Sequence, residues 1–279
     1  MDYRESRFTT GDGLTLHCRS WLPLGEPKAV LVLVHGLSEH SGRYRTLGEH
    51  LTRHGYALSA LDLRGHGMSG GERIFVRSLD VHLSDVAAFL DRLRAEQPGR
   101  PLVLFGHSMG GLIVASLAVL RELDVCGLVL SAPALRVSDE VAPGLRWLAR
   151  AASLLAPRLR IVRIRSGKLS RDPSVVDGFN NDPLVYHGYM PNRTAGEILR
   201  GARWIQHRLE SVRLPFLAMH GTGDAVTDPA GSRQLYLRSQ STDKTLKLYD
   251  GLWHDLLREP EKAQVMADLV DWLDARRGC

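Results

Sequence analysis

The stretch Phe105-Gly106-His107-Ser108-Met109-Gly110-Gly111 contains the pattern Gly-x-Ser-x-Gly. The apolar run 101–105 before it predicts a buried strand, and the apolar run 112–120 after it is long enough for a buried helix. In a strand-to-helix turn this sharp, Cβ atoms on either side of the serine would clash, so glycines are needed there. The stretch therefore predicts a strained turn that exposes the Ser108 hydroxyl at the end of a sheet.

The order of apolar runs around this turn predicts the architecture. An Asp-Gly turn joins the first two runs as a hairpin, and the later strands alternate with helices, which favours a mostly parallel sheet. The predicted strands cover residues 8–10, 14–21, 29–34, 56–61, 101–105, 126–131, 214–220 and 245–249, and the predicted helices cover 43–54, 83–93, 112–120 and 260–276. The sequence thus predicts an α/β fold whose central sheet of about eight strands is flanked by helices.

The alternation of strands and helices breaks between residues 134 and 206. No convincing strand is found there, and apolar residues recur at helical spacing from Leu145 to Leu155. Thr194-Ala195-Gly196-Glu197 has the form of a capping box that opens another helix. We therefore predict a core of residues 1–133 and 207–279, with residues 134–206 forming a helical cap over the site.

Two further residues complete a predicted proton relay with Ser108. Asp224 follows the strand 214–220 in a glycine turn, and His254 follows the last strand in a loop that contains glycine. A serine hydroxyl is a poor nucleophile at neutral pH, so it needs a base to take its proton and a carboxylate to hold that base. The order serine, acid, histidine is that of α/β-hydrolases. Asp228, in the same loop as Asp224, is the alternative acid.

The turn after the strand 29–34 begins with His35-Gly36. α/β-Hydrolases place half of their oxyanion hole at this point, because a glycine lets a backbone N–H turn into the site. We assign the two N–H donors to Leu37 and Met109, and we expect them to stabilise the charge of a tetrahedral intermediate. His35 itself is interpreted as a structural residue of the turn.

Composition and motifs exclude several other classes of protein. The net charge of +5 is modest, and no nucleic-acid-binding motif accompanies it. The glycine-rich stretch 62–71 fits neither a P-loop nor a dinucleotide fingerprint, and is predicted to be a turn braced by Asp62 and Arg64. Histidines cluster between residues 35 and 54, but no cysteine or carboxylate set joins them at metal-ligand spacing. We expect no metal, no cofactor and no nucleic-acid partner.

The absence of targeting signals predicts a cytoplasmic protein. Residues 1–7 lack the apolar core of a secretory signal, and no apolar run reaches the length of about 18 residues that a membrane span needs. The three cysteines are scattered and odd in number, which suits a reducing compartment rather than a disulfide framework.

A basic stretch lies inside the predicted cap. A solvated loop is the first explanation, and the alternative is peripheral contact with an anionic membrane surface beside the apolar cap helices. The cations are Arg158, Arg160, Arg163, Arg165, Lys168 and Arg171.

Several of these motifs resemble those of the monoacylglycerol lipase family of serine α/β-hydrolases, and the resemblance extends over nearly the whole chain. The block His35-Gly36-Leu37-Ser38-Glu39-His40-Ser41-Gly42-Arg43-Tyr44 is the most specific to that family. The other matching blocks are residues 62–69, 106–111, 131–134 and 243–247, together with the loop that ends in His254.

The resemblance implies hydrolysis of monoacylglycerols to glycerol and fatty acid, without a cofactor, under an amphipathic cap that meets membranes. It also implies that Glu39 and Arg43 shape the polar end of the pocket, where glycerol would sit. Leu257 departs from the animal members, which carry there another histidine thought to help bind glycerol. The cap is also richer in arginine than in those members.

The same residues would serve other reactions. A broader carboxylesterase or a lysophospholipase would use the same triad, and an acyltransferase would differ only in excluding water. A non-catalytic binding protein on this scaffold usually lacks one member of the triad, whereas this chain has candidates for all three. Dehalogenases and epoxide hydrolases need a carboxylate at the position of Ser108. We therefore predict a serine carboxylester hydrolase, with a monoacylglycerol as its expected substrate.

Overall fold

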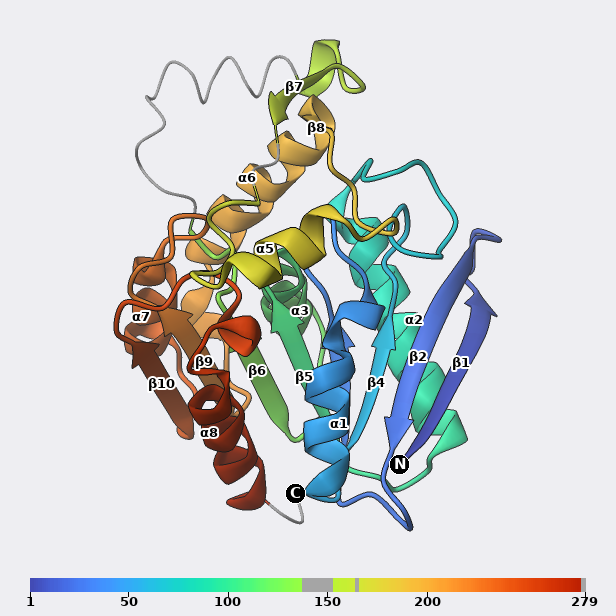
Figure 1. Ribbon diagram of the computed structural model, residues 1–279, viewed down its shortest axis with the longest axis vertical. Coiled ribbons are helices and arrows are strands. Elements are labelled where there is room, and N and C mark those ends of the chain that lie inside the picture. Colours follow the sequence, from blue (N-terminus) through green and yellow to red (C-terminus); the bar gives the residue numbers. More distant parts are fainter. Residues whose placement is uncertain (137–152, 164–165, 277–279) are drawn as a thin grey trace.

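A computed structural model describes residues 1–136, 153–163 and 166–276 of the chain. The strands of its central sheet are β1 (Asp2–Thr9), β2 (Thr15–Leu22), β3 (Val30–Val34), β4 (Ala57–Leu61), β5 (Leu102–His107), β6 (Gly127–Ser131), β9 (Phe216–Gly221) and β10 (Lys244–Tyr249). They lie in the order β1-β2-β4-β3-β5-β6-β9-β10 (Figure 1). β2 pairs antiparallel with both β1 and β4, and every further pair is parallel. The predicted fold class is confirmed.

Helices cover both faces of this sheet (Figure 1). The helices around the sheet are α1 (Arg45–Arg53), α2 (Leu79–Glu96), α3 (Met109–Leu120), α7 (Pro229–Arg238) and α8 (Lys262–Asp274), with short 3-10 turns η1 (Ser41–Tyr44), η2 (Leu209–Ser211) and η3 (Leu256–Arg258). Side chains of α1 and α8 pack in one hydrophobic cluster, and those of α2, α3 and α7 pack in the other. The central strands are buried on both faces, which is why they read as continuous apolar runs.

The parallel strands bring the candidate residues to one edge of the sheet. In a parallel sheet, the loops that follow the carboxyl ends of the strands meet at the same edge. The loops after β3, β5, β9 and β10 carry His35, Ser108, Asp224 and His254 respectively. Residues separated by up to 219 positions in the chain therefore gather at one place, because the topology alternates strand and helix.

The segment 134–206 contains strands that the sequence analysis did not predict. β7 (Arg160–Arg163) and β8 (Tyr189–Pro191) pair antiparallel, next to α5 (Pro173–Asn180) and α6 (Asn192–Gln206). These strands are only four and three residues long, too short to show an alternating pattern, and their pairing partner lies in a distant part of the segment. The predicted helical stretch from Leu145 to Leu155 lies mostly outside the described residues, and residues 153–155 are helical.

The predicted capping box at the start of α6 is wrong. α6 already begins at Asn192 and has no side-chain cap. The hydroxyl of Thr194 accepts the backbone N–H of Val76 at 2.9 Å instead, and the carboxylate of Glu197 accepts the N–H of Leu79 at 3.2 Å. Leu79 is the first residue of α2. Both side chains thus fasten α6 to the first residue of α2 and to the segment that leads into it, and a local pattern cannot distinguish these bonds from a cap.

No helix in the described ranges combines the length and the apolar character that crossing a membrane requires. Cys18 is a buried free thiol, whereas Cys126 is disulfide-bonded. The disulfide of Cys126 differs from the free thiols that the sequence analysis expected in a reducing compartment.

His82 is buried in α2 with no exposed surface. Neither of its ring nitrogens has a hydrogen-bond partner in the part of the chain that the structure describes. Burial lowers the pKa of His82 to about 3, with a smaller effect from the charges of Arg64 and His35. The folded protein therefore holds this imidazole neutral under conditions in which the unfolded chain would protonate it.

We expect the free energy of unfolding to fall as the pH decreases below the ordinary histidine value of about 6.5, because the unfolded chain then binds a proton that folded His82 excludes. The loss for one such group approaches about 1.4 kcal/mol per pH unit down to a pH of about 3. Urea unfolding of the wild type and of His82→Leu, followed by circular dichroism at about pH 7 and about pH 4.5, measures the difference. An equal loss of stability in both proteins would contradict the prediction.

Candidate active site

Ser108 occupies the turn between β5 and α3. Its φ of +53° lies in the left-handed region, which residues with a side chain rarely adopt. A Cβ on Gly110 would lie 2.0 Å from the carbonyl oxygen of Val34, and a Cβ on Gly106 would lie 2.6 Å from the carbonyl oxygen of Gly110. The backbones of the turn and of β3 can approach this closely only because both positions are glycine. The strained turn predicted from the sequence is present.

The loops after β9 and β10 bring Asp224 and His254 together. Nδ1 of His254 donates to Oδ2 of Asp224 at 2.7 Å, and both side chains are buried. The other carboxylate oxygen of Asp224 accepts two backbone N–H groups of its own loop, which orients the carboxylate. Asp228, the alternative acid, instead caps α7 by accepting the N–H of Ala230 at 2.9 Å.

The charges of this buried pair stabilise each other. Burial opposes the ionised form of Asp224, but the charge of His254 and the hydrogen bonds from His220 and His254 outweigh it and hold the pKa of Asp224 well below its usual range. Burial likewise opposes the protonated form of His254, but the charge and the hydrogen bond of Asp224 outweigh it and raise the pKa of His254. Asp224 therefore stays ionised and makes His254 a stronger base than an ordinary histidine.

His107 is the chain neighbour of Ser108 and contacts the ring of His254. The ring centroids of His107 and His254 are 4.9 Å apart, and His107 directly precedes Ser108. Across the described ranges, no hydrogen bond joins the Ser108 hydroxyl to the His254 ring. The hydrogen bonds of a catalytic relay often tighten only when substrate binds, so this arrangement is compatible with proton transfer between the two side chains.

The two predicted oxyanion donors lie in the turn after β3 and at the first residue of α3. As far as the structure describes the chain, neither the N–H of Leu37 nor that of Met109 has a hydrogen-bond partner. A free N–H is usual at the first residue of a helix. The turn after β3 lies against Ser108, since a Cβ on Gly36 would lie 3.1 Å from Cβ of Ser108. Both candidate donors are thus unpaired, one in the residue after Gly36 and the other in the residue after Ser108.

Glu39 and Arg43 are both buried beside this turn. Oε1 of Glu39 accepts the N–H of Gly36 and the hydroxyl of Tyr44, each at 2.7 Å. Burial opposes its charge, but nearby histidine and arginine charges outweigh it and hold the pKa of Glu39 below its usual range. The guanidinium of Arg43 lies 4.8 Å from the ring centroid of Phe179, and its Nε has no hydrogen-bond partner among the residues described. Glu39 therefore holds the turn, and the guanidinium of Arg43 lies between two carboxylates, 3.5 Å from Glu39 and 3.7 Å from Asp255.

The chain is similar to known hydrolases over almost its whole length. The family profile Hydrolase_4, described as "Serine aminopeptidase, S33", matches residues 25–261. The monoacylglycerol lipase of Mycolicibacterium smegmatis is 35% identical over 269 residues, which cover 96% of each chain. The monoglyceride lipase of Homo sapiens is 36% identical over 268 residues, which cover 95% of this chain and 88% of the human protein. This chain belongs to the monoacylglycerol lipase family.

Solved structures of family members have the same fold. The monoacylglycerol lipase of Paleococcus ferrophilus superposes with a TM-score of 0.82 at 30% identity, covering 99% of this chain and 100% of that one. A soluble variant of the Saccharomyces cerevisiae monoglyceride lipase, solved with a substrate analogue, superposes with a TM-score of 0.86 over 99% of this chain and 96% of its own. Its identity is 24%, so this second likeness concerns the fold alone. The predicted family is confirmed.

The residues just after His254 combine an apolar side chain with an ion pair. Leu257 is 4% exposed and brings no polar group. Nη1 of Arg258 donates to both carboxylate oxygens of Asp255, at 2.8 Å to Oδ1 and 2.7 Å to Oδ2. The guanidinium of Arg258 lies 4.9 Å from the ring centroid of Tyr44. An ion pair therefore follows His254 directly in the chain, and the sequence indicates it only as two charged residues inside an apolar run.

Sequence reasoning also missed two residues that contact Asp224, the predicted acid. Oδ2 of Asp224 lies 3.1 Å from Nε2 of His220 and accepts the hydroxyl of Thr227 at 2.8 Å. The same hydroxyl lies 3.4 Å from Nδ1 of His254. Both residues stand within four positions of Asp224, but nothing in the local pattern separates them from their neighbours.

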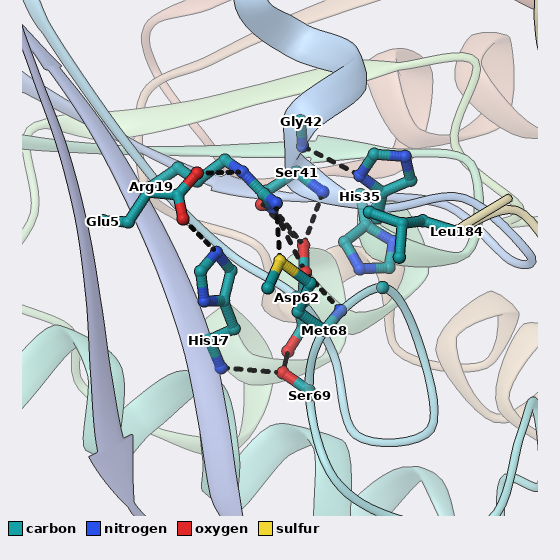
Figure 2. A network of polar contacts seen from close by, with 12 residues as sticks. Glu5, His17, Arg19, His35, Ser41, Gly42, Asp62, Met68, Ser69 and Leu184 are labelled. Atoms are coloured by element: carbon teal, nitrogen blue, oxygen red, sulfur yellow. Dashed lines mark hydrogen bonds and ion pairs between the residues drawn. The ribbon is translucent and has the colours of Figure 1, made fainter. Parts of the chain in front are cut away.

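Figure 2 shows Asp62 at the centre of a buried polar network next to the turn after β3. The carboxylate accepts the N–H of Ser41 at 2.7 Å, and Nη1 of Arg19 lies 3.2 Å from it. Arg64 makes no part of this network and pairs with Asp85 of α2 at 2.6 Å. Asp62 and Arg64 thus brace their turn against different elements. Because Ser41 opens η1, Asp62 holds the segment that carries Arg43.

Proposed function

We propose that this protein is a serine carboxylester hydrolase that cleaves monoacylglycerols into glycerol and fatty acid. The observation that carries the proposal is the buried Asp224–His254 pair, 2.7 Å apart, beside the strained turn of Ser108. Relatives named monoacylglycerol lipase and monoglyceride lipase support this class of substrate. In this assignment Ser108 is the nucleophile, His254 is the general base and Asp224 orients the base.

The proposed reaction proceeds through an acyl-enzyme. Oγ of Ser108 attacks the ester carbonyl carbon while His254 takes the hydroxyl proton. The N–H groups of Leu37 and Met109 stabilise the resulting oxyanion, each by about 3 kcal/mol. The bond to the glycerol oxygen then breaks, and glycerol leaves with the proton from His254. Water attacks the acyl group in the same way, which releases the fatty acid and restores the hydroxyl of Ser108.

In the proposed architecture, residues 134–206 form a cap on a core of residues 1–133 and 207–279. Figure 1 shows α5 lying across the carboxyl ends of the central strands, where it would cover a bound acyl ester. The Arg43 guanidinium, under Phe179 of α5, would donate to the hydroxyl groups of the glycerol moiety. Glu39 would act on the glycerol end indirectly, through the turn it holds.

We expect kcat/KM for a monoacylglycerol to exceed that for the di- and triacylglycerol of the same acyl chain by at least about tenfold. A site built to hydrogen-bond hydroxyl groups discriminates against analogues in which those groups are esterified. Fatty-acid release from the three substrates at a matched acyl chain measures the ratio. Equal turnover of p-nitrophenyl esters would favour a broader carboxylesterase, and a preference for lysophospholipids would favour a lysophospholipase. Acyl transfer to an added alcohol in place of water would indicate an acyltransferase.

We further propose that the cap touches a lipid surface through apolar side chains. The side chains at the β7–β8 end of the cap are exposed by 48% to 86%, and they are Leu154, Leu155, Leu159, Ile161, Val162 and Tyr189. Several cations of the basic stretch pair with the protein's own carboxylates: Arg158 with Glu72 at 3.1 Å, and Arg171 with Glu259 at 2.5 Å. The apolar side chains therefore contribute more to this proposed contact than the charges do.

We expect Leu155→Glu combined with Ile161→Glu to lower binding to vesicles of mixed zwitterionic and anionic phospholipid by at least about tenfold, since each apolar side chain contributes roughly 1.5–3 kcal/mol when it is fully buried. Co-sedimentation with the vesicles measures the effect. Leu237→Glu is the matched control, because this leucine is 74% exposed on α7, outside the cap. Equal binding of all three proteins would contradict a lipid contact through the cap.

A further inference from the structure

Glu259 joins the cap to the loop that carries His254. Its carboxylate has no exposed surface. Oε1 accepts the backbone N–H of Arg171 at 2.7 Å, and Oε2 accepts Nε of the same arginine at 2.5 Å. The Arg171 guanidinium also pairs with Glu261, which is 48% exposed. One arginine of the segment 134–206 therefore neutralises a fully buried carboxylate with its guanidinium and donates a further hydrogen bond to it from its backbone.

The backbone on both sides of His254 is held at this junction. The N–H of Trp253 donates to Oε2 of Glu259 at 3.3 Å, and the N–H of Asp255 donates to the carbonyl oxygen of Leu169 at 2.8 Å. Leu169 lies two residues before Arg171, in the same stretch of the cap. The N–H before His254 is thus bonded to Glu259 itself, and the N–H after His254 is bonded to the stretch of the cap that Glu259 anchors.

The anchored stretch continues into the turn after β3. α5 follows Arg171 directly, since Asp172 is its N-cap. Beyond the end of α5, the carboxylate of Asp182 lies 2.9 Å from Nε2 of His40, and the N–H of Tyr186 donates to the carbonyl oxygen of Ser38 at 3.0 Å. Residues 169–186 are therefore fastened at one end to the His254 loop and at the other end to the loop that carries the proposed oxyanion donor.

We propose that Glu259 is a positioning residue that sets the place of the His254 imidazole relative to Ser108. The inference rests on the proposed function. Reacting groups must be held in a near-attack geometry, and a displacement of about 1 Å can cost about 100-fold in rate. A carboxylate that binds Trp253 and Arg171 together fixes the His254 loop against the cap. Exchanging it for an amide removes one acceptor and sets an NH₂ group against donors, which releases the loop.

Steady-state kinetics on two esters separates this role from simple support of the cap. We expect Glu259→Gln to lower kcat by about 10- to 100-fold on both p-nitrophenyl butyrate and a long-chain monoacylglycerol, with KM changed by less than about threefold. The short ester makes few contacts with a cap, so equal losses locate the defect at His254. A loss confined to the long-chain ester would overturn the inference. Glu261→Gln, which alters the exposed partner of the same arginine, is the matched control and should keep wild-type rates.

Amide hydrogen exchange tests whether Glu259 holds the His254 loop, without relying on catalysis. Glu259→Gln should raise exchange at Trp253 and Asp255 by at least about tenfold, while Glu261→Gln should leave it unchanged. Unchanged exchange in Glu259→Gln would overturn the inference, whatever the activity. If the wild type hydrolyses neither ester, the proposed function fails, and raised exchange would still show that Glu259 holds this loop.

A second pair of variants covers the case in which Glu259→Gln does not fold. Arg171→Met keeps the backbone N–H that Glu259 accepts but removes the guanidinium, so we expect a smaller loss of kcat on both esters. Arg171→Lys restores a positive charge next to Glu259 and should recover part of that loss. Equal and wild-type kcat values in both variants would overturn the inference.

Discussion

Replacing Ser108 by alanine is expected to lower kcat/KM for ester hydrolysis by about 10⁴- to 10⁶-fold. Without the hydroxyl no acyl-enzyme forms, and the remaining backbone donors stabilise only a direct attack by water. The φ of +53° strains alanine and serine equally, so the fold should be retained. Initial rates with a monoacylglycerol, together with labelling by a fluorophosphonate, measure the loss.

The matched control for this change is Ser116→Ala. Ser116 lies in α3, two turns after Ser108, and its buried hydroxyl has no hydrogen-bond partner within the described residues. Removing an unpaired buried hydroxyl costs little, so activity should stay within about twofold of the wild type. Fluorophosphonate labelling of the wild type that persists in Ser108→Ala would show that another residue is the nucleophile. A wild-type protein that neither turns over esters nor is labelled would point to a binding function.

Asp224→Asn is expected to reduce kcat by about 10⁴-fold, because an amide neither stabilises the imidazolium nor holds the required tautomer of His254. The pH profile should change as well. In the wild type Asp224 raises the pKa of His254, so the acid limb of kcat/KM lies above the ordinary histidine value of about 6.5. Since His254 acts as a base only when neutral, loss of the carboxylate charge should move that limb to lower pH. Residual activity measured from about pH 5 to 9 tests the shift.

Asp228→Asn separates the two candidate acids. Asp228 caps α7 and pairs with Arg136 at 3.0 Å, so its replacement should cost at most about 1 kcal/mol of stability while kcat stays within about threefold. Thermal unfolding and initial rates on the same preparations give both quantities. If Asp228→Asn abolished turnover and Asp224→Asn did not, the assignment of the acid would have to be exchanged.

The pattern of apolar residues was sufficient to predict the elements whose residues are buried along their whole length. All five residues of β3 are apolar and buried on both faces, and such runs bounded by turn residues are typical of parallel strands. β7 and β8 were missed because they are stabilised by pairing with each other, not by an apolar pattern of their own. Thr194 and Glu197 match a helix cap in spacing, yet they bond to the segment that leads into α2. Spacing along the chain shows which bonds a side chain is able to make, not which partner is nearest.

Residue type and order alone identified a glycine-bounded serine, a late acid and a final histidine, because this chemistry needs those groups and the fold presents them in that order. Only the tertiary structure decided that Asp224, and not Asp228 four positions later, faces His254. It also brought Glu259 and Arg171 together against the loop of that histidine. The reason is physical: a hydrogen bond depends on distances and angles of a few tenths of an ångström and a few degrees between atoms, and these are set by how the strands and helices pack.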